Sequence, residues 1–146
     1  MDFSSDAAAD VVTQAVIVEL IAAEGSSYLE ADLQYDPRDP CAVTIKFGSA
    51  QTEVSWTFAR ELLLCGLYEP TGDGDVHIRP HLDTEGRAVV IIEFHAPGGQ
   101  ALVQAHSRDI QLFVDRMTTA VEPGTEGQHM NVDHTIAAIL VANAGE

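Results

Sequence analysis

The sequence predicts an α+β protein in which each run of antiparallel strands is followed by a helix. Segments that alternate between apolar and polar residues, as half-buried strands do, recur at residues 29–35, 43–47, 54–58 and 76–81. Short turns rich in proline, glycine and acidic residues separate them, so successive strands can pair as a meander. The apolar spacing becomes helical near residues 59–66 and again near 110–117. We therefore expect about seven or eight strands in the order ββββα-βββα, followed by a C-terminal helix.

The first two strands follow a short polar leader. Residues 11–21 are dense in β-branched side chains, which favour a strand although a helix is conceivable. Both faces of this segment are apolar, so it needs cover on two sides. Residues 29–35 alternate cleanly and predict a half-buried strand. Pro37 and Pro40 end it, because proline cannot donate to a strand ladder.

Two further strands lead into a short helix. Residues 43–47 and 54–58 alternate again, and residues 48–51 join them as a hairpin loop. From Ala59 the spacing is helical, and we expect Gly66 to end this helix in a left-handed conformation. Residues 70–75 predict a tight acidic turn.

Three strands open the second half. Residues 76–81 alternate, and residues 87–95 contain an unbroken apolar run that suits a central strand covered on both faces. The turn at 96–99 leads into a further strand at 100–105. The strand at 87–95 and the one at 11–21 carry more apolar surface than one sheet face can bury. Unless the helices cover that surface, we expect a homo-oligomer to bury it.

Two helices complete the predicted fold. Ile110, Phe113, Val114 and Met117 follow helical spacing, with Ser107 expected as the N-cap. The residue pair at 123–124, proline then glycine, stops this helix. Residues 131–140 then predict a last amphipathic helix.

The composition is that of one acidic domain. The chain has 146 residues, of which 46% are hydrophobic, so it can bury one core. Seven Lys and Arg against 23 Asp and Glu give a formal net charge of −16. Nucleic acids and anionic membranes bind through cations, so neither is expected as the main partner. No stretch reaches the roughly 20 apolar residues that cross a bilayer, so we expect no membrane insertion.

The N-terminus and the cysteines indicate a cytoplasmic protein. Residues 1–10 carry acidic groups and no cation, which excludes a secretory signal, and we expect them to form a disordered leader to one domain at 11–146. Cys41 and Cys65 lie in apolar stretches. They could form one disulfide, but free, buried thiols in a reducing cytoplasm are the preferred interpretation.

Candidate catalytic and metal-binding residues do not form a recognisable site. His77 and His81 share a strand face but lie about 13 Å apart at roughly 3.3 Å per residue, too far to share an ion. The glycine-rich turn at 72–74 lacks the lysine and long helix of a phosphate site, and its surroundings fail the calcium-loop pattern. No nucleophile elbow is present, and acid pairs are expected by chance among 23 carboxylates. We expect no enzymatic activity, no cofactor and no metal.

Four aromatic residues could form a base-stacking platform for single-stranded nucleic acid. They are Phe47, Trp56, Phe58 and Phe94. Each also lies on the apolar face of its strand, and no cations cluster beside them. We predict that they pack in the core.

Four long motifs carry a family resemblance. They are LQYDPRDP at 33–40, VSWTFARELL at 54–63, GLYEPTGDGDV at 66–76 and PGTE at 123–126. Together they resemble the SsgA-like family of actinobacterial sporulation and cell-division regulators, over about residues 11–142. The leader and the loop at 82–86 do not match.

The resemblance implies a fold and a function. It implies a Whirly-like fold, a type known from single-stranded DNA-binding proteins, assembled as a homotrimer whose sheet extends across subunits. It also implies action without catalysis: members recruit or tether the tubulin-like protein FtsZ at the septum, together with other SsgA-like or septal proteins. The family's loop at the PGTE motif is associated with function, which assigns Gly124 and Glu126 to a partner interface. There Gly124 would permit a bend and Glu126 would present an exposed charge, although the loop could equally be a simple connector.

Two other functions remain as alternatives. A Whirly-like scaffold suggests a module that binds single-stranded nucleic acid, but a charge of −16 per subunit, about −48 in three copies, repels DNA. A sensor of a small ligand or metal is the third alternative. The charge favours a protein partner.

Overall fold

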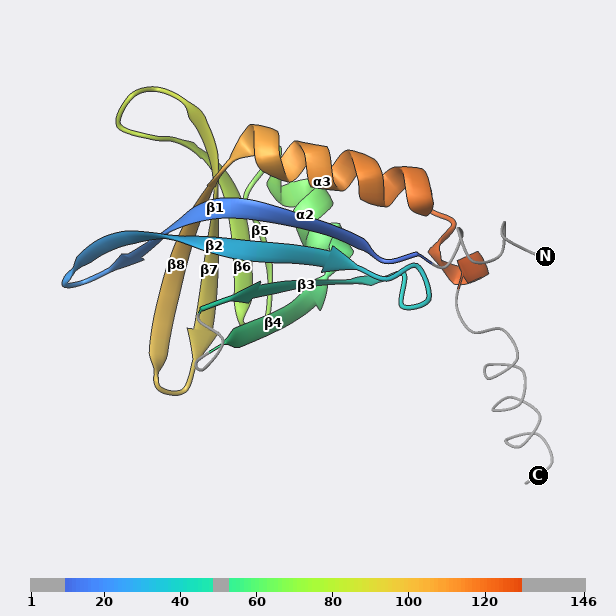
Figure 1. The fold of residues 1–146 in the computed structure, drawn as a ribbon, viewed down its shortest axis with the longest axis horizontal. Helices are drawn as coiled ribbons and strands as arrows, with labels where there is room; N and C mark the ends of the chain where they lie inside the picture. The colour runs from blue at the N-terminus through green and yellow to red at the C-terminus, as the bar shows by residue number, and fades with distance from the viewer. Residues whose placement is uncertain (1–9, 49–52, 130–146) are drawn as a thin grey trace.

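The computed structural model describes residues 10–48 and 53–129, which form eight strands, two α-helices and one 3₁₀ helix (Figure 1). The predicted α+β class and the strands-then-helix order of both halves are confirmed. The leader at 1–9 and the predicted helix at 131–140 lie outside the described residues. The elements are β1 (Val12–Ala22), β2 (Gly25–Tyr35), β3 (Ala42–Phe47), β4 (Val54–Ala59), α2 (Arg60–Gly66), β5 (Thr71–Asp73), β6 (Val76–Leu82), β7 (Ala88–Ala96), β8 (Gly99–His106), α3 (Ser107–Ala120) and η1 (Glu126–His129).

The strands form one antiparallel sheet in the order β4-β3-β2-β1-β8-β7-β6-β5. Each half of the chain is a four-stranded meander, and the halves meet where β1 pairs with β8. This seam is short: only Val18–Ile21 of β1 pair with β8, whereas all of β1 pairs with β2. The two halves therefore cross steeply in Figure 1, and α3 runs along the part of β1 that does not pair with β8.

Both helices pack on the inner face of this coiled sheet. The apolar stripe of α3 is buried there and consists of Ile110, Phe113, Val114 and Met117. Polar contacts fasten the same helix to β1, since Gln14 Nε2 donates to the Asp109 carbonyl at 2.8 Å. Apolar burial and these bonds together hold the second half's helix against the first half's strand.

The predicted aromatic core is confirmed. Phe47, Phe58 and Phe94 are buried, and the partly buried Trp56 ring stacks on Phe94 with centroids 4.9 Å apart. Because Trp56 belongs to β4 and Phe94 to β7, this stack closes the coiled sheet on itself across its two halves.

The two strands with surplus apolar surface differ. In β7 the run Val89–Ile92 is buried on both faces, as predicted for a central strand. In β1, Val16 and Val18 are buried on the inner face, but Ile17 on the outer face is 54% exposed. An open apolar face thus remains on β1 alone of these two strands.

Gly66 is required for close packing rather than for its own backbone conformation. The prediction of a left-handed Gly66 is wrong, because Gly66 is not one of the described glycines that have a positive φ. Leu67, which follows it, is right-handed. Instead, a Cβ on Gly66 would lie 2.3 Å from Ile78 Cγ2. Glycine is needed because α2 lies directly against β6.

Two further local predictions are wrong. Within the predicted turn at 70–75, residues Thr71–Asp73 form strand β5, because a tighter turn at Gly74, with φ of 63°, lets them pair with β6. The N-cap of α3 is His106 rather than Ser107, and it makes no side-chain capping bond. Since β8 runs without a break into α3, the last strand residue occupies the cap.

The cysteines are free but not buried. Cys41 is exposed and Cys65 is half-buried, which corrects the prediction of two buried thiols. Cys41 ends a surface turn because β3 begins only at Ala42. The Cys65 thiol lies 3.7 Å from Glu61 Oε2 on the side of α2, and desolvation together with that carboxylate raises the pKa of Cys65.

The packing of Gly66 makes a testable prediction. Gly66→Ala inserts a methyl group into Ile78, and overpacking should outweigh the better helix propensity of alanine, lowering stability by about 1–2 kcal/mol. Gly98→Ala is the control, because no atom of the described residues lies within 4 Å of a Cβ there. Urea unfolding of both variants measures the difference, and equal midpoints would show that α2 does not need this close approach.

Candidate functional site

A buried arginine lies at the centre of the candidate site. Arg60, the first residue of α2, is only 1% exposed. Its backbone N–H donates to the Cys41 carbonyl at 2.8 Å, which fixes the start of the helix against the β2–β3 connection. A buried guanidinium is costly unless its donors are paired, so the groups around Arg60 determine whether the structure is stable.

Tyr35 is the first partner of Arg60. Arg60 Nη1 donates to the Tyr35 hydroxyl at 3.1 Å, and that hydroxyl donates to the Pro40 carbonyl at 2.9 Å. The guanidinium also lies over the tyrosine ring, 5.5 Å from its centroid, in a cation–π contact. Burial raises the pKa of Tyr35, although the Arg60 charge opposes this, so the ring stays a neutral hydrogen-bonding group.

Glu126 is the second partner and neutralises the buried charge. Arg60 Nε donates to Glu126 Oε2 at 3.1 Å. Arg60 Nη2 lies 3.1 Å from the same oxygen, close enough for an ion pair, but makes no hydrogen bond in good geometry. The other carboxylate oxygen, Oε1, accepts from the Gly124 N–H at 2.8 Å. We call this set of Tyr35, Arg60, Gly124 and Glu126 the arginine clamp.

The pKa of Glu126 is lowered by this environment. Its own backbone N–H is the largest cause, followed by the positive charge of Arg60 and the N–H of Gly124, all acting against desolvation. Each of these groups favours the ionised carboxylate. The clamp therefore holds Glu126 as an anion at neutral pH.

The structure brings the two predicted site residues together and changes the role of one. Gly124 has φ of 90° and forms the bend between α3 and η1, as expected. Glu126 does not present a free exposed charge: its side chain is 19% exposed and turned toward Arg60, because the buried guanidinium requires a counter-charge. The loop carrying both is thus fixed to the body of the protein.

Arg60 and Tyr35 were not predicted as site residues, although they belong to the family motifs at 33–40 and 54–63. One signal was available for Arg60. A cation in the first turn of a helix opposes the helix dipole, so it indicates that another group holds it there. Nothing in the local pattern marked Tyr35 as more than an inward-facing strand residue.

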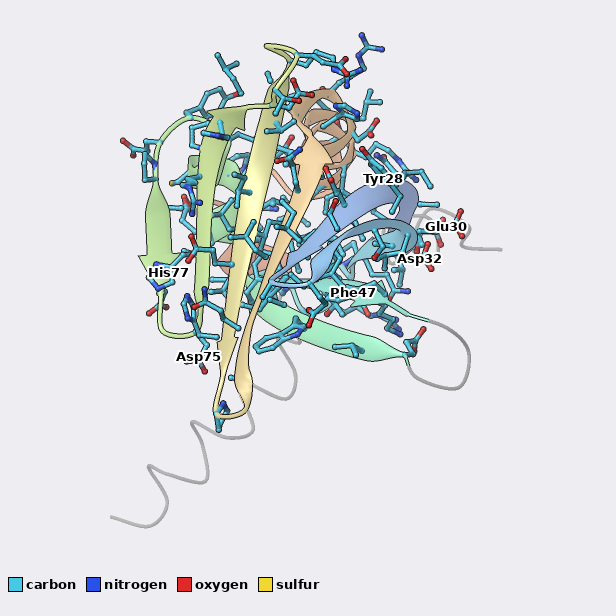
Figure 2. The ribbon with its side chains drawn as sticks, turned by 90° about the vertical axis from the view of Figure 1, so that its left-hand side faces the viewer. Tyr28, Glu30, Asp32, Phe47, Asp75 and His77 are labelled. Atoms are coloured by element: carbon cyan, nitrogen blue, oxygen red, sulfur yellow. The ribbon has the colours of Figure 1, made fainter. Side chains whose placement is uncertain are left out.

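The histidines lie elsewhere on the sheet. His77 packs edge-on against His95, with ring centroids 5.4 Å apart, and His95 Nε2 lies 3.3 Å from Glu93 Oε1. Figure 2 shows His77 and Asp75 toward one side of the sheet, away from Tyr28, Glu30 and Asp32 on β2. Within residues 10–48 and 53–129, no group of three His, Cys, Asp or Glu side chains is arranged to hold a metal. None of the helices described is long and apolar enough to span a membrane.

The fold and the clamp define a class of protein. It is an α+β domain with one continuous antiparallel sheet. In it a buried arginine at the start of α2 fixes the loop that follows α3. The arrangement positions a loop: the partners of Arg60 restrain residues 121–126, whose tip at Glu122, Pro123 and Gly124 is exposed.

The chain belongs to the SsgA family. The family model described as "Streptomyces sporulation and cell division protein, SsgA" matches residues 29–126, which include every residue of the arginine clamp. Sporulation-specific cell division protein SsgB of Streptomyces coelicolor is 41% identical over 122 residues, 83% of this chain and 88% of that protein. The SsgB of Saccharopolyspora erythraea is 40% identical over 113 residues, 77% of this chain and 79% of its own. These relatives confirm the resemblance that the motifs indicate and place the chain close to SsgB.

Two solved structures are similar to the described fold. One, reported under the words "Mutations in SsgB correlate to longitudinal cell division during sporulation of Streptomyces coelicolor", has a TM-score of 0.77 at 40% identity, covering 83% of this chain and 96% of that one. The other is an SsgA-like sporulation-specific cell division protein from Thermobifida fusca, with a TM-score of 0.80 at 33% identity, covering 90% and 96%.

The lowered pKa of Glu126 makes a pH-dependent prediction. A carboxyl whose pKa is lower in the folded state stabilises the fold above its ordinary value, here 4.5, and loses that contribution as the pH falls through the folded-state pKa. Glu126→Gln should therefore lower the Tm at pH 7, with a smaller difference from the parent at acidic pH. Melting curves between pH 7 and about pH 3 measure this difference.

Glu122→Gln is the matched control, because it makes the same chemical change at an exposed position of the same loop. It should leave the Tm nearly unchanged. If Glu126→Gln and Glu122→Gln melted alike at every pH, the clamp would not contribute to stability.

Proposed function

We propose that this protein is a non-enzymatic regulator of cell division that recruits and tethers FtsZ at septum sites during sporulation-type septation. The observation that carries the proposal is the arginine clamp, which lies wholly inside the family-matched segment and holds an exposed loop in a fixed position. The relatives named sporulation-specific cell division protein SsgB support the cellular process. A fixed loop loses little conformational entropy on binding, so it suits recognition of another protein.

A homotrimer with a Whirly-like sheet is part of the same proposal. Two features of β1 and β2 support self-association. Pairing with β3 covers only Ala31–Gln34 of β2, so its segment 25–30 has an open edge among the described residues. The side chains of Ile17 and Tyr28 on the adjacent outer face are exposed apolar groups. An open strand edge beside apolar side chains favours pairing with another chain.

Binding of single-stranded nucleic acid is less well supported. The aromatic side chains that would stack on bases are packed in the core. Arg38, Arg60, Arg79 and Arg87 already pair with carboxylates, which removes four of the seven cations from phosphate binding. A gel shift at low salt, where electrostatic binding is strongest, tests this alternative directly.

Co-sedimentation tests FtsZ recruitment. At saturating concentration the protein should pellet with assembled FtsZ and stay in the supernatant without it. Gly124→Ala, which places a side chain at φ of 90°, should distort the loop and reduce the pelleted fraction several-fold. Gly98→Ala, at an unstrained and uncrowded position, should pellet like the parent.

The outcomes separate the two parts of the proposal. An unchanged supernatant at saturating FtsZ would refute recruitment itself. Normal pelleting of both glycine variants, each folded by circular dichroism, would retain recruitment but refute the loop as the interface.

A further inference from the structure

A groove of about 680 Å³ opens at the other end of α3 from the clamp. It lies between the residues that follow α2, the end of β6, the start of β7 and the first turn of α3. Figure 1 shows that this turn of α3 lies beside the β6–β7 hairpin. Its walls are mainly apolar and are formed by Leu67, Tyr68, Pro80, Leu82, Ala88 and Val89. It is a separate surface, because the 14 residues of α3 span about 21 Å between its two ends.

Two large side chains are unusually exposed in this groove. Tyr68 is 74% exposed and Leu82 is 60% exposed. The Tyr68 hydroxyl donates to Gln111 Oε1 at 3.2 Å, so the ring is tied to α3 across the groove. Exposed apolar side chains gathered at one hollow are typical of an interaction site.

Among the residues that the structure describes, one cation faces this groove without a carboxylate partner. Arg108 lines the groove, is exposed, and makes no ion pair within the described residues. Arg87, at the neighbouring hollow, is already paired with Asp83 and Glu85. Arg108 is also the second residue of α3, where a cation opposes the helix dipole. A ligand carboxylate would relieve this unfavourable position.

We propose that the groove is a docking site for an apolar peptide segment of a partner that carries a carboxylate, with Arg108 as its anchor. The apolar walls bury the segment's aliphatic side chains, and Arg108 forms a charge-assisted hydrogen bond with the carboxylate. The net charge of −16 does not prevent this, since charges beyond roughly 8–10 Å are largely screened at physiological salt. The proposal goes beyond FtsZ recruitment and does not require it.

An NMR titration of the full chain tests the proposal. The probe is an acetylated, amidated peptide of about eight residues with three leucines and one aspartate, and two matched peptides replace the aspartate by asparagine or lysine. Weak binding is measurable by this method, and amide shifts should cluster at Leu67, Tyr68, Leu82 and Arg108. The aspartate peptide should bind roughly tenfold or more tightly than the other two.

Paired variants separate the anchor from the walls. Arg108→Ala should weaken the aspartate peptide roughly tenfold and leave the asparagine peptide unchanged. Arg38→Ala, at an exposed arginine far from the groove in the β2–β3 connection, should change neither. Leu82→Ser should weaken both peptides, whereas Leu112→Ser is the control, because Leu112 is similarly exposed at 51% but does not line the groove.

Several results would overturn the proposal. They are an absence of binding by the aspartate peptide, equal binding of the asparagine or lysine peptide, and an Arg108→Ala variant that binds like the parent. Shifts centred outside the groove would overturn it as well.

Discussion

The burial of one guanidinium constrains much of this structure. Arg60 lies where β4 becomes α2, and a buried cation must be neutralised and hydrogen-bonded to be tolerated. Tyr35 from the end of β2 and Glu126 from the chain beyond α3 meet that requirement. Because an unpaired Arg60 would be costly, the end of β2, the start of α2 and the chain after α3 must lie together, although they are distant in sequence. Removing a partner affects all three.

The clamp also compensates for a weak connection in the sheet. The two meanders share only the four residue pairs between β1 and β8. Their union depends on contacts outside the ladder: α3 packed along β1, the Trp56–Phe94 stack between β4 and β7, and the clamp between α2 and η1. These contacts lie at different places on the inner face, so together they oppose hinge motion at the seam.

The sequence predicted the fold more fully than the site, for a physical reason. Periodicity reports which face of an element is buried, so the strands, both helices and the aromatic core followed from local patterns. Strand β5 was not predicted, because its three residues, Thr71–Asp73, are too few to show a period. The role of Arg60 was not predicted, because its charge is neutralised by Glu126, 66 residues away, and no local pattern indicates that pair. Gly124 and Glu126 were found only through the family resemblance.

The two ends of α3 carry different kinds of surface. At its C-terminal end the clamp fixes a loop through the contacts that Glu126 makes with Arg60 and Gly124. At its N-terminal end Arg108 borders an apolar groove, and within the part of the chain that the structure describes it makes no ion pair and His106 makes no capping bond. The charges of the clamp pair with each other, whereas the groove presents a cation and apolar side chains to solvent. Because α3 separates the two surfaces by about 21 Å, the proposed binding of FtsZ at the loop and the proposed binding of a peptide at the groove are compatible in one domain.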